Sequence, residues 1–207
     1  DAFIKGVKGP VIDGRQGRYD ADSSLPGAHN RQNAGLALAM AVALGADETK
    51  ARAALLDFSG VERRMQLVGH CAGAEVYDDY AHHPEELRAT ITSLRGIFPG
   101  RKIMAIFQPH LYTRTRDFAP EFAEVLSLCD KVIMIPIYPA RELPIEGVTS
   151  ELIGRSITAS WELVDRFDVA NYLKDVDTDV VVTFGAGNID VICNDVAEVL
   201  KAKVNNN

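Results

Sequence analysis

The stretch EVYDDYAHHPEELRATITSLRGI, residues 75–97, contains the unit whose repetition decides the fold. Residues 75–79 form a run of strand length, and a polar segment follows them. Pro84 stands where the first turn of a helix accepts a proline, and two glutamates come next, in the turn where the helix dipole favours negative charge. The stretch therefore predicts a strand, a polar connection and a helix over residues 84–97.

The same unit recurs along the chain after about residue 65. Runs of strand length occupy residues 75–79, 102–108, 131–135 and 179–184, with a weaker one at 162–164. Helical patterns lie between or after them, at residues 84–97, 116–128, 150–158, 169–174 and 189–201. Strands and helices that alternate at this spacing predict an α/β fold, in which right-handed crossovers give a mostly parallel sheet with helices on both faces.

The first part of the chain has a different pattern. Residues 1–24 are rich in glycine and are expected to form short strands and turns. An alanine-rich helix is predicted over residues 31–44, ended by Gly45, and Asp47 is the predicted N-cap of a second helix. The glycine and the charges of residues 58–64 then indicate a domain boundary.

The composition argues against several classes of protein. The chain has 207 residues, 47% of them hydrophobic and 25% charged, which is typical of a globular protein with a buried core. Its net charge of −7 argues against nucleic acid as the main partner, because such binding favours a basic face. No apolar run reaches the roughly 18–20 residues that cross a membrane. Three widely spaced cysteines, Cys71, Cys129 and Cys193, predict buried free thiols in a reducing compartment, and hence a cytoplasmic protein.

Polar side chains gather where the predicted strands end. The four segments are DDYAHHP (78–84), QPHLYTRTR (108–116), PIYPARE (136–142) and GAGNI (185–189). Because the carboxyl ends of parallel strands form the ligand crevice of an open sheet, we expect one binding site at that edge. The alternative is that the segments are unrelated solvated loops, in which His82 and His83 only cap the next helix.

Taken singly, these segments leave other interpretations open. The two adjacent histidines are poor zinc ligands, because they point apart on a turn and no further ligand stands at a familiar spacing. The stems of Arg114 and Arg116 can cover apolar surface. GAGN is not a dinucleotide fingerprint, although its amides can lie near an anion, and Tyr138 fits a structural role.

Another signal lies in GAHNRQNA, residues 27–34. Asn30 and Asn33 stand three residues apart at a helix start, so both amides can face the same way. Paired amides suit the edge of a nucleobase, which carries donors and acceptors. The alternative is that Asn30 only caps the helix.

Five motifs together resemble a known family. PGAHNRQNA, GVERRMQ, YDDYAHHP, FQPHLYTRTR and GAGNI occur in this order at suitable spacing, and they resemble the Mur ligases of peptidoglycan synthesis. The pair YDDYAHHP and FQPHLYTRTR is most similar to the branch that adds L-alanine to UDP-N-acetylmuramate. The resemblance implies an amide ligase that uses ATP and Mg²⁺ to phosphorylate a carboxylate, after which an amine displaces phosphate from the acyl phosphate.

The resemblance also implies a role for particular residues. Residues 1–60 would be the end of the central ATP-binding domain, and residues 61–207 the Rossmann-like C-terminal domain. The implied nucleotide-binding residues are His29, Asn30 and Asn33 at the adenine and Arg64 and Asp79 at the phosphate and ribose. The implied catalytic residues, which face the alanine and the acyl phosphate, are Tyr80, His82, His110 and Arg114. No metal ligand is assigned within this chain.

The sequence departs from the family pattern at several positions. Leu111 stands where an arginine often follows the motif histidine, Met65 replaces a phenylalanine, and Arg31 and Gln32 resemble a D-glutamate-adding relative. No G-x-x-x-x-G-K-[ST] motif occurs, so we expect the phosphate-binding loop, the UDP-binding domain and most Mg²⁺ ligands to lie upstream, and this chain alone to be inactive. The alternatives are another Mur ligase, such as the tripeptide ligase, and a nucleotide-binding module without chemistry.

Overall fold

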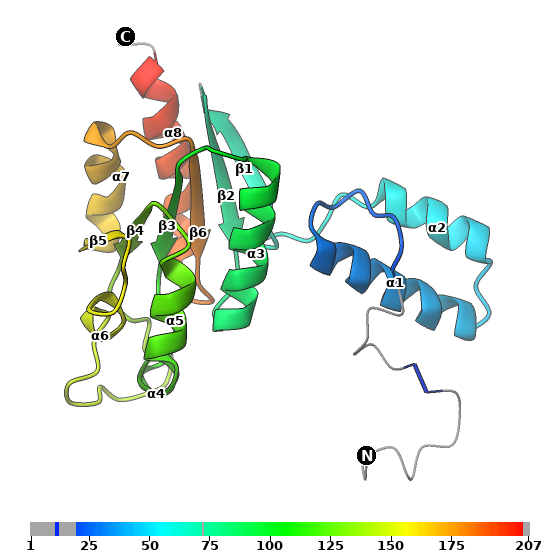
Figure 1. The fold of residues 1–207 in the computed structure, drawn as a ribbon, viewed down its shortest axis with the longest axis horizontal. Coiled ribbons are helices and arrows are strands. Elements are labelled where there is room, and N and C mark those ends of the chain that lie inside the picture. Colours follow the sequence, from blue (N-terminus) through cyan, green and yellow to red (C-terminus); the bar gives the residue numbers. More distant parts are fainter. Residues whose placement is uncertain (1–10, 13–19, 72, 205–207) are drawn as a thin grey trace. The chain divides into compact units, whose positions relative to one another are not determined.

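The computed structural model describes residues 11–12, 20–71 and 73–204 (Figure 1). For residues 203 and 204 it describes the backbone alone. The strands are β1 Gln66–Cys71, β2 Ala74–Asp79, β3 Ile103–Phe107, β4 Lys131–Met134, β5 Ser160–Leu163 and β6 Val180–Phe184. The α-helices are α1 Ala28–Ala43, α2 Glu48–Asp57, α3 Pro84–Ile97, α4 Tyr112–Asp117, α5 Ala119–Leu126, α6 Glu151–Gly154, α7 Val169–Tyr172 and α8 Cys193–Val204. Short 3₁₀ turns are η2 Arg166–Asp168, η3 Leu173–Asp175 and η4 Ile189–Ile192.

The six strands form one sheet in the order β1-β2-β6-β3-β4-β5. The five strands from β2 to β5 in this order are parallel, and β1 pairs antiparallel with β2. The prediction of an α/β fold with a mostly parallel sheet is therefore confirmed, and the five predicted strands agree with the observed ones to within two residues. The strand β1 was not predicted.

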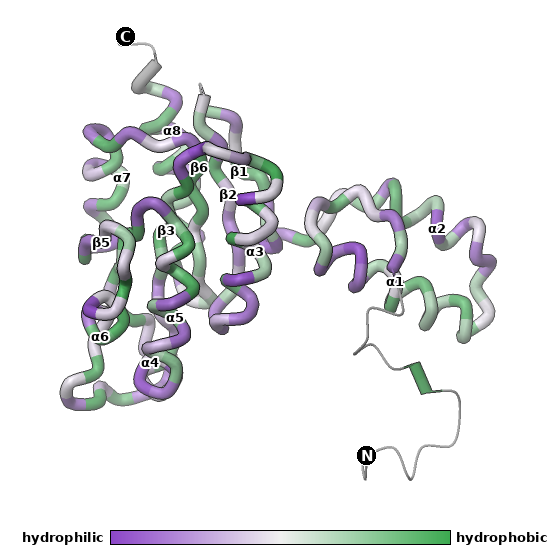
Figure 2. Tube along the Cα trace, viewed as in Figure 1, coloured by the Kyte–Doolittle hydropathy of each residue, from purple (hydrophilic) through white to green (hydrophobic). Residues whose placement is uncertain are grey.

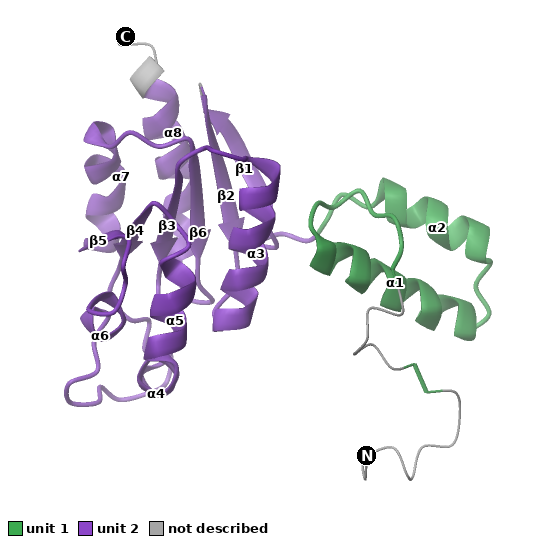
Figure 3. Cartoon of the chain, in the orientation of Figure 1, with its two compact units in different colours: residues 1–60 green, residues 61–207 purple. Residues whose placement is uncertain are grey.

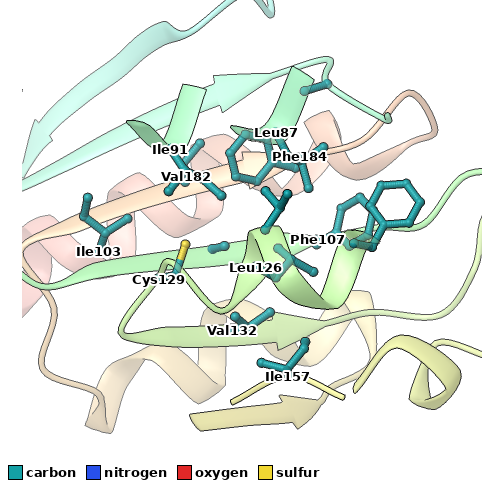
Figure 4. Packing of buried hydrophobic residues seen from close by; sticks show 14 of the residues in the cluster. Leu87, Ile91, Ile103, Phe107, Leu126, Cys129, Val132, Ile157, Val182 and Phe184 are labelled. Atoms are coloured by element: carbon teal, nitrogen blue, oxygen red, sulfur yellow. The ribbon is translucent and has the colours of Figure 1, made fainter. Parts of the chain in front are cut away.

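Helices cover both faces of the sheet. Because alternate strand residues point to opposite faces, each central strand contributes side chains to two cores. On β3, Ile103, Ala105 and Phe107 join the core under α3, α5 and α6, whereas Met104 and Ile106 join the core under α7 and α8. Figure 4 shows the first of these cores, in which helix side chains pack directly on strand side chains. Along the tube in Figure 2, α3 alternates between hydrophobic and hydrophilic residues, as expected for a helix with one buried face.

The helices agree with the prediction least well in the middle of the chain. Helix α3 begins and ends at the predicted residues. The single helix predicted over residues 116–128 is instead two helices, α4 and α5, which meet at Phe118. Pro120 lies in the first turn of α5, where a proline is tolerated, but it could not continue a helix from α4. The helix predicted over residues 150–158 is only the short α6.

The chain divides into two compact units, residues 1–60 and 61–207 (Figure 3). In the first unit, α1 ends before Gly45, whose φ is +96°. The N-cap of α2 is Asp47, whose side chain accepts a hydrogen bond from Lys50 N (2.9 Å). Both signals were predicted. The short strands expected in residues 1–24 fall mostly outside the described residues, and the assignment of this unit to an ATP-binding domain stays a prediction.

Two further observations concern the chain as a whole. Cys71, Cys129 and Cys193 are buried and free, as predicted. None of the helices in the described part of the chain combines the length and the hydrophobicity needed to cross a membrane.

Candidate functional site

The register of the sheet brings the four polar segments to one edge. Asp79 on β2 pairs with Phe184 on β6, Phe184 pairs with Phe107 on β3, and Phe107 pairs with Met134 on β4. These parallel strands therefore end side by side, and the chain leaves each of them at the same edge (Figure 1). The predicted convergence is confirmed by contacts between the segments.

The carboxylate of Asp79 fixes the start of the first segment. Its Oδ1 accepts a hydrogen bond from Ala81 N (2.9 Å), and its Oδ2 accepts from Met65 N (3.0 Å) and from the Thr90 hydroxyl (2.7 Å). The side chain is buried, and burial raises its pKa against the lowering effect of these bonds. All three of these donors are groups of the protein itself. The predicted contact of Asp79 with a nucleotide therefore stays a prediction.

The two adjacent histidines point in different directions, as predicted. The Nδ1 atom of His82 lies 3.0 Å from Tyr80 O and 3.5 Å from Glu86 Oε2. His83 packs edge-on against Phe118, with ring centroids 4.8 Å apart. Glu86 Oε2 also accepts hydrogen bonds from the backbone N–H groups of His82 (2.9 Å) and His83 (3.2 Å), which anchors the segment to the first turn of α3.

Four aromatic side chains from three segments form a continuous row, which we call the ring row. The ring centroids of Tyr80 and His82 are 5.4 Å apart, those of His82 and His110 are 5.9 Å apart, and those of His110 and Tyr138 are 5.6 Å apart. Arg114 lies on α4, and its Nη1 is 3.3 Å from His110 Nδ1. The structure therefore brings together all the residues predicted to be catalytic, and it adds Tyr138.

The contact with Arg114 determines the protonation of His110. A guanidinium has no acceptor, so His110 Nδ1 must accept and the neutral ring carries its proton on Nε2. Burial first, and then the charges of Arg114 and His82, lower the pKa of His110. A neutral imidazole at this position can accept a second proton, which is the property required of a general base.

The segment after β3 is held by the segment after β4. Leu111 N donates to Tyr138 O (3.0 Å), and Tyr138 N donates to Pro109 O (2.8 Å). Leu111 has a φ of +74°, in the left-handed region that a leucine rarely adopts, and α4 begins directly after it. The carboxylate of Glu142 accepts from Thr113 N (3.0 Å) and from its hydroxyl. These contacts fix the direction of α4 and with it the position of Arg114.

The glycine-rich segment after β6 packs against the same groups. Gln108 Nε2 donates to Asn188 Oδ1 (3.0 Å), and Gly185 N donates to Asp79 O (3.2 Å). A Cβ on Gly187 would lie 2.5 Å from Gln108 Oε1 and 2.6 Å from Cγ of the neighbouring tyrosine in the ring row. Position 187 is therefore restricted to glycine by close packing.

Two residues near this edge were missed by the sequence analysis. Arg63 donates from Nε to Asp78 Oδ2 (3.0 Å), although the neighbouring Arg64 was the predicted residue. Arg64 is exposed, and its charge lowers the pKa of Asp79 without outweighing burial. Tyr138, interpreted from the sequence as structural, stacks on His110. A signal for Arg63 existed, since the motif contains two arginines, but nothing in the sequence distinguishes them.

The predicted adenine-binding residues lie on α1, within the first unit. The N-cap of α1 is Gly27, so Asn30 does not cap the helix; its side chain donates to Pro26 O (2.7 Å). Asn33 is exposed one turn further on, and His29 lies on the first turn. Their contact with a nucleotide stays a prediction. In the part of the chain that the structure describes, no group of three His, Cys, Asp or Glu side chains could hold a metal ion.

Comparisons with known proteins agree with this geometry. Residues 63–187 match the family described as "Mur ligase, glutamate ligase domain". The chain is 43% identical over 167 residues to the UDP-N-acetylmuramate–L-alanine ligase of Cytophaga hutchinsonii, which covers 80% of this chain and 36% of the relative. It is 47% identical over 152 residues to the ligase of the same name from an Arthrobacter species. This match covers 73% of this chain and 32% of the relative. The chain thus spans about a third of the length of these curated relatives.

Solved structures show the same likeness. The UDP-N-acetylmuramate–alanine ligase of Thermotoga maritima superimposes with a TM-score of 0.72 at 28% identity, covering 88% of this chain and 40% of that one. A murein peptide ligase of Psychrobacter arcticus gives a TM-score of 0.64 at 25% identity, covering 87% and 38%. The family match extends over more than half of the residues, and it includes three of the four polar segments in full and the fourth in part. This chain therefore belongs to the Mur ligase family.

Proposed function

We propose that this chain is the C-terminal part of an ATP-dependent ligase that joins L-alanine to UDP-N-acetylmuramate through an acyl phosphate. The observation that carries the proposal is the contact between His82 and His110, which unites the two motifs most typical of the alanine-adding branch. The identity of 43–47% with ligases of that name supports it. ATP and a UDP-sugar are cytoplasmic metabolites, so we place the reaction in the cytoplasm.

The side chains of the ring row suit the second step of this reaction. The amine of alanine attacks the acyl carbonyl, the phosphate leaves, and the nitrogen loses a proton. Neutral His110 can take that proton on Nδ1, which becomes available when the contact with Arg114 changes. Arg114 can bind the alanine carboxylate through two parallel hydrogen bonds. Tyr80 and His82 then line the same site.

The nucleotide is assigned to other residues. We propose that Asn30 and Asn33, with His29, contact the adenine, and that Arg64 meets the phosphates while Asp79 lies near the ribose. The described residues offer no ligand cluster for Mg²⁺, so the proposal assigns no step of the metal to them. Magnesium would accompany ATP as its counter-ion, neutralising charge on the phosphates.

The decisive experiment is a chimaeric ligase in which this chain replaces the part of the Cytophaga hutchinsonii ligase that it matches. We expect phosphate release that requires ATP, Mg²⁺, UDP-N-acetylmuramate and L-alanine together. A panel of amino acids and the tripeptide distinguishes the alanine-adding function from that of a peptide ligase. A folded chimaera that binds ATP but releases no phosphate with any acceptor would favour a module without chemistry and would refute the proposal.

Variants of the chimaera test the assignment of the amino-acid site. His110→Ala and Arg114→Ala are expected to raise the KM for L-alanine at least tenfold and to change the KM for ATP less than threefold. Arg116→Ala is the matched control, since Arg116 lies on the same helix, is exposed and pairs with Asp117 (2.7 Å). An effect on ATP alone would reverse the assignment. The isolated chain is expected to release no phosphate, because it has no G-x-x-x-x-G-K-[ST] loop.

A further inference from the structure

Arg63 connects three separate segments of the edge through its guanidinium. Its Nε donates to Asp78 Oδ2 on β2 (3.0 Å), and its Nη2 donates to Gly185 O after β6 (2.7 Å). Its Nη1 lies 3.8 Å from Asp190 Oδ1 on η4. The side chain of Arg63 is 20% exposed and that of Asp78 is 5% exposed, so the ion pair is largely removed from water.

The same residue also holds Tyr80, the first member of the ring row. Tyr80 N donates to Arg63 O (2.7 Å), and the guanidinium carbon lies 5.1 Å from the centroid of the Tyr80 ring. A cation at this distance from an aromatic face is attracted to the ring. Main chain and side chain of Arg63 therefore act on the same tyrosine from two directions.

The backbone around Arg63 is shaped for these contacts. Arg63 and Met65 have φ values of +58° and +47°, which are uncommon for residues other than glycine. Arg63 N donates to Gln66 Oε1 (2.8 Å), and Met65 N donates to Asp79 Oδ2 (3.0 Å). These bonds stabilise a turn whose cost in backbone energy is met by groups of the site, which is typical of a functional constraint.

The carboxylate that receives Arg63 is itself held from the other side. Asp78 Oδ1 accepts a hydrogen bond from the buried hydroxyl of Thr183 (2.6 Å) on β6. The planar guanidinium can serve Asp78 and Gly185 at once, whereas the ammonium of a lysine is a single point charge on a flexible stem. The contacts thus require arginine in particular.

We propose that Arg63 is a positioning residue of the site, which holds the Tyr80 ring and the glycine-rich segment 185–188 in place against the ring row. This inference rests on the proposed function, because it takes Tyr80 as part of the amino-acid site. Arg63 does not need to touch a substrate: its role is to fix groups that do. A ligand would then meet a tyrosine and a glycine-rich turn that are already ordered.

The first test uses this chain as it is. We expect Arg63→Ala to shift the NMR signals of the Tyr80 ring and of the amides of residues 185–188, and to speed hydrogen exchange of the Tyr80 amide at least tenfold. Arg63→Lys should restore these signals only in part. The matched control is Arg95→Ala, because Arg95 also bonds a carboxylate, Asp130 (2.7 Å), and the carbonyls of other segments, but at the opposite edge of the sheet.

The control separates positioning from general stability. Arg95→Ala should leave the Tyr80 and 185–188 signals in place even if it lowers the melting temperature as much. Signals that are the same in wild type and in both Arg63 variants would overturn the proposal. If Arg63→Ala does not fold, the lysine variant gives the answer, since it keeps the charge and loses the geometry.

The second test uses the chimaeric ligase. We expect Arg63→Ala to lower kcat at least tenfold and to change the KM for ATP less than threefold, with partial recovery in Arg63→Lys and less than a twofold change in Arg95→Ala. Equal losses in the Arg63 and Arg95 variants would mean that Arg63 acts only through stability. An inactive wild-type chimaera would refute the proposed function, whereas the NMR result on this chain would still decide whether Arg63 positions the edge.

Discussion

Thr90→Val removes one of three donors to a buried carboxylate and changes almost nothing else. The hydroxyl of Thr90 donates to Asp79 Oδ2 (2.7 Å), and both side chains are buried. Valine has nearly the same shape as threonine, so no cavity forms and the helix propensity hardly changes. The change therefore isolates the hydrogen bond that ties α3 to the end of β2.

The expected loss is about 2 kcal/mol, within the range of about 1.5–3 kcal/mol for a hydrogen bond to a charged group. For a domain of this size, that corresponds to a fall in Tm of about 4–8 °C. Burial raises the pKa of Asp79 above its ordinary value of 3.8, so the folded chain keeps a proton over a pH range in which the unfolded chain has lost it. The contribution of this group to stability therefore falls as the pH rises through that range.

The pH dependence makes the prediction sharper. Without the Thr90 hydroxyl the ionised form of Asp79 is stabilised less, so the pKa rises further and the loss in Thr90→Val grows with pH. Unfolding in urea is followed by the fluorescence of Trp161, the single tryptophan, which lies in the second unit. Thr92→Val, an exposed site on the same helix, should change stability by less than about 0.5 kcal/mol. A Thr90→Val loss below 0.5 kcal/mol at pH 7, or one that does not vary with pH, would refute the reasoning.

Three further predictions concern other parts of the second unit. Gly187→Ala should lower the free energy of unfolding in urea by about 1–3 kcal/mol, because the added Cβ would lie 2.5 Å from a side-chain oxygen. The control is Gly96→Ala, whose added Cβ would meet no other part of the fold within 4 Å, and which should be neutral or stabilising by up to about 1 kcal/mol. Burial and then Arg114 lower the pKa of His110, so the contribution of this group to stability rises with pH up to about 6.5. Arg114→Gln should therefore raise the pKa of His110 in an NMR titration, and an unchanged pKa would contradict the assigned contact. Burial raises the pKa of Cys129 to about 12, so this thiol should react with Ellman's reagent at pH 8 only after denaturation, and rapid labelling of the folded chain would show the burial to be wrong.

The sheet could be predicted from the sequence because its central strands are buried on both faces. A parallel strand such as β6, VVVTF, is apolar except for Thr183 and carries its signal in its own residues. The strand β1, QLVGHC, is the outermost strand on its side of the sheet. Only Cys71 in it is buried, and its register with β2 shifts between Leu67 and Gly69. It forms because it pairs with β2, and its own residues show no periodicity that predicts a strand.

The site was predictable to the level of segments but not of individual side chains. Strand order alone brings His82 and His110 to one edge. Arg63 has a left-handed φ and bonds Asp78, whereas Arg64 is exposed, and no sequence pattern distinguishes the two neighbours. The stacking of Tyr138 likewise depends on its bridge to His110, a contact between distant parts of the chain.

The position of Glu86 has a consequence for the charge that the site can accept. The start of α3 is the positive end of a helix dipole and would ordinarily attract a phosphate or a carboxylate. Here Glu86 already accepts hydrogen bonds from the amides of His82 and His83. Burial raises the pKa of Glu86, but these bonds and the charge of His82 lower it overall, so Glu86 remains an anion. The helix end is thus neutralised from within, and anion binding at this edge falls to side chains. Since His110 is kept neutral near pH 7, Arg114 is the member of the predicted catalytic group whose positive charge persists at every physiological pH.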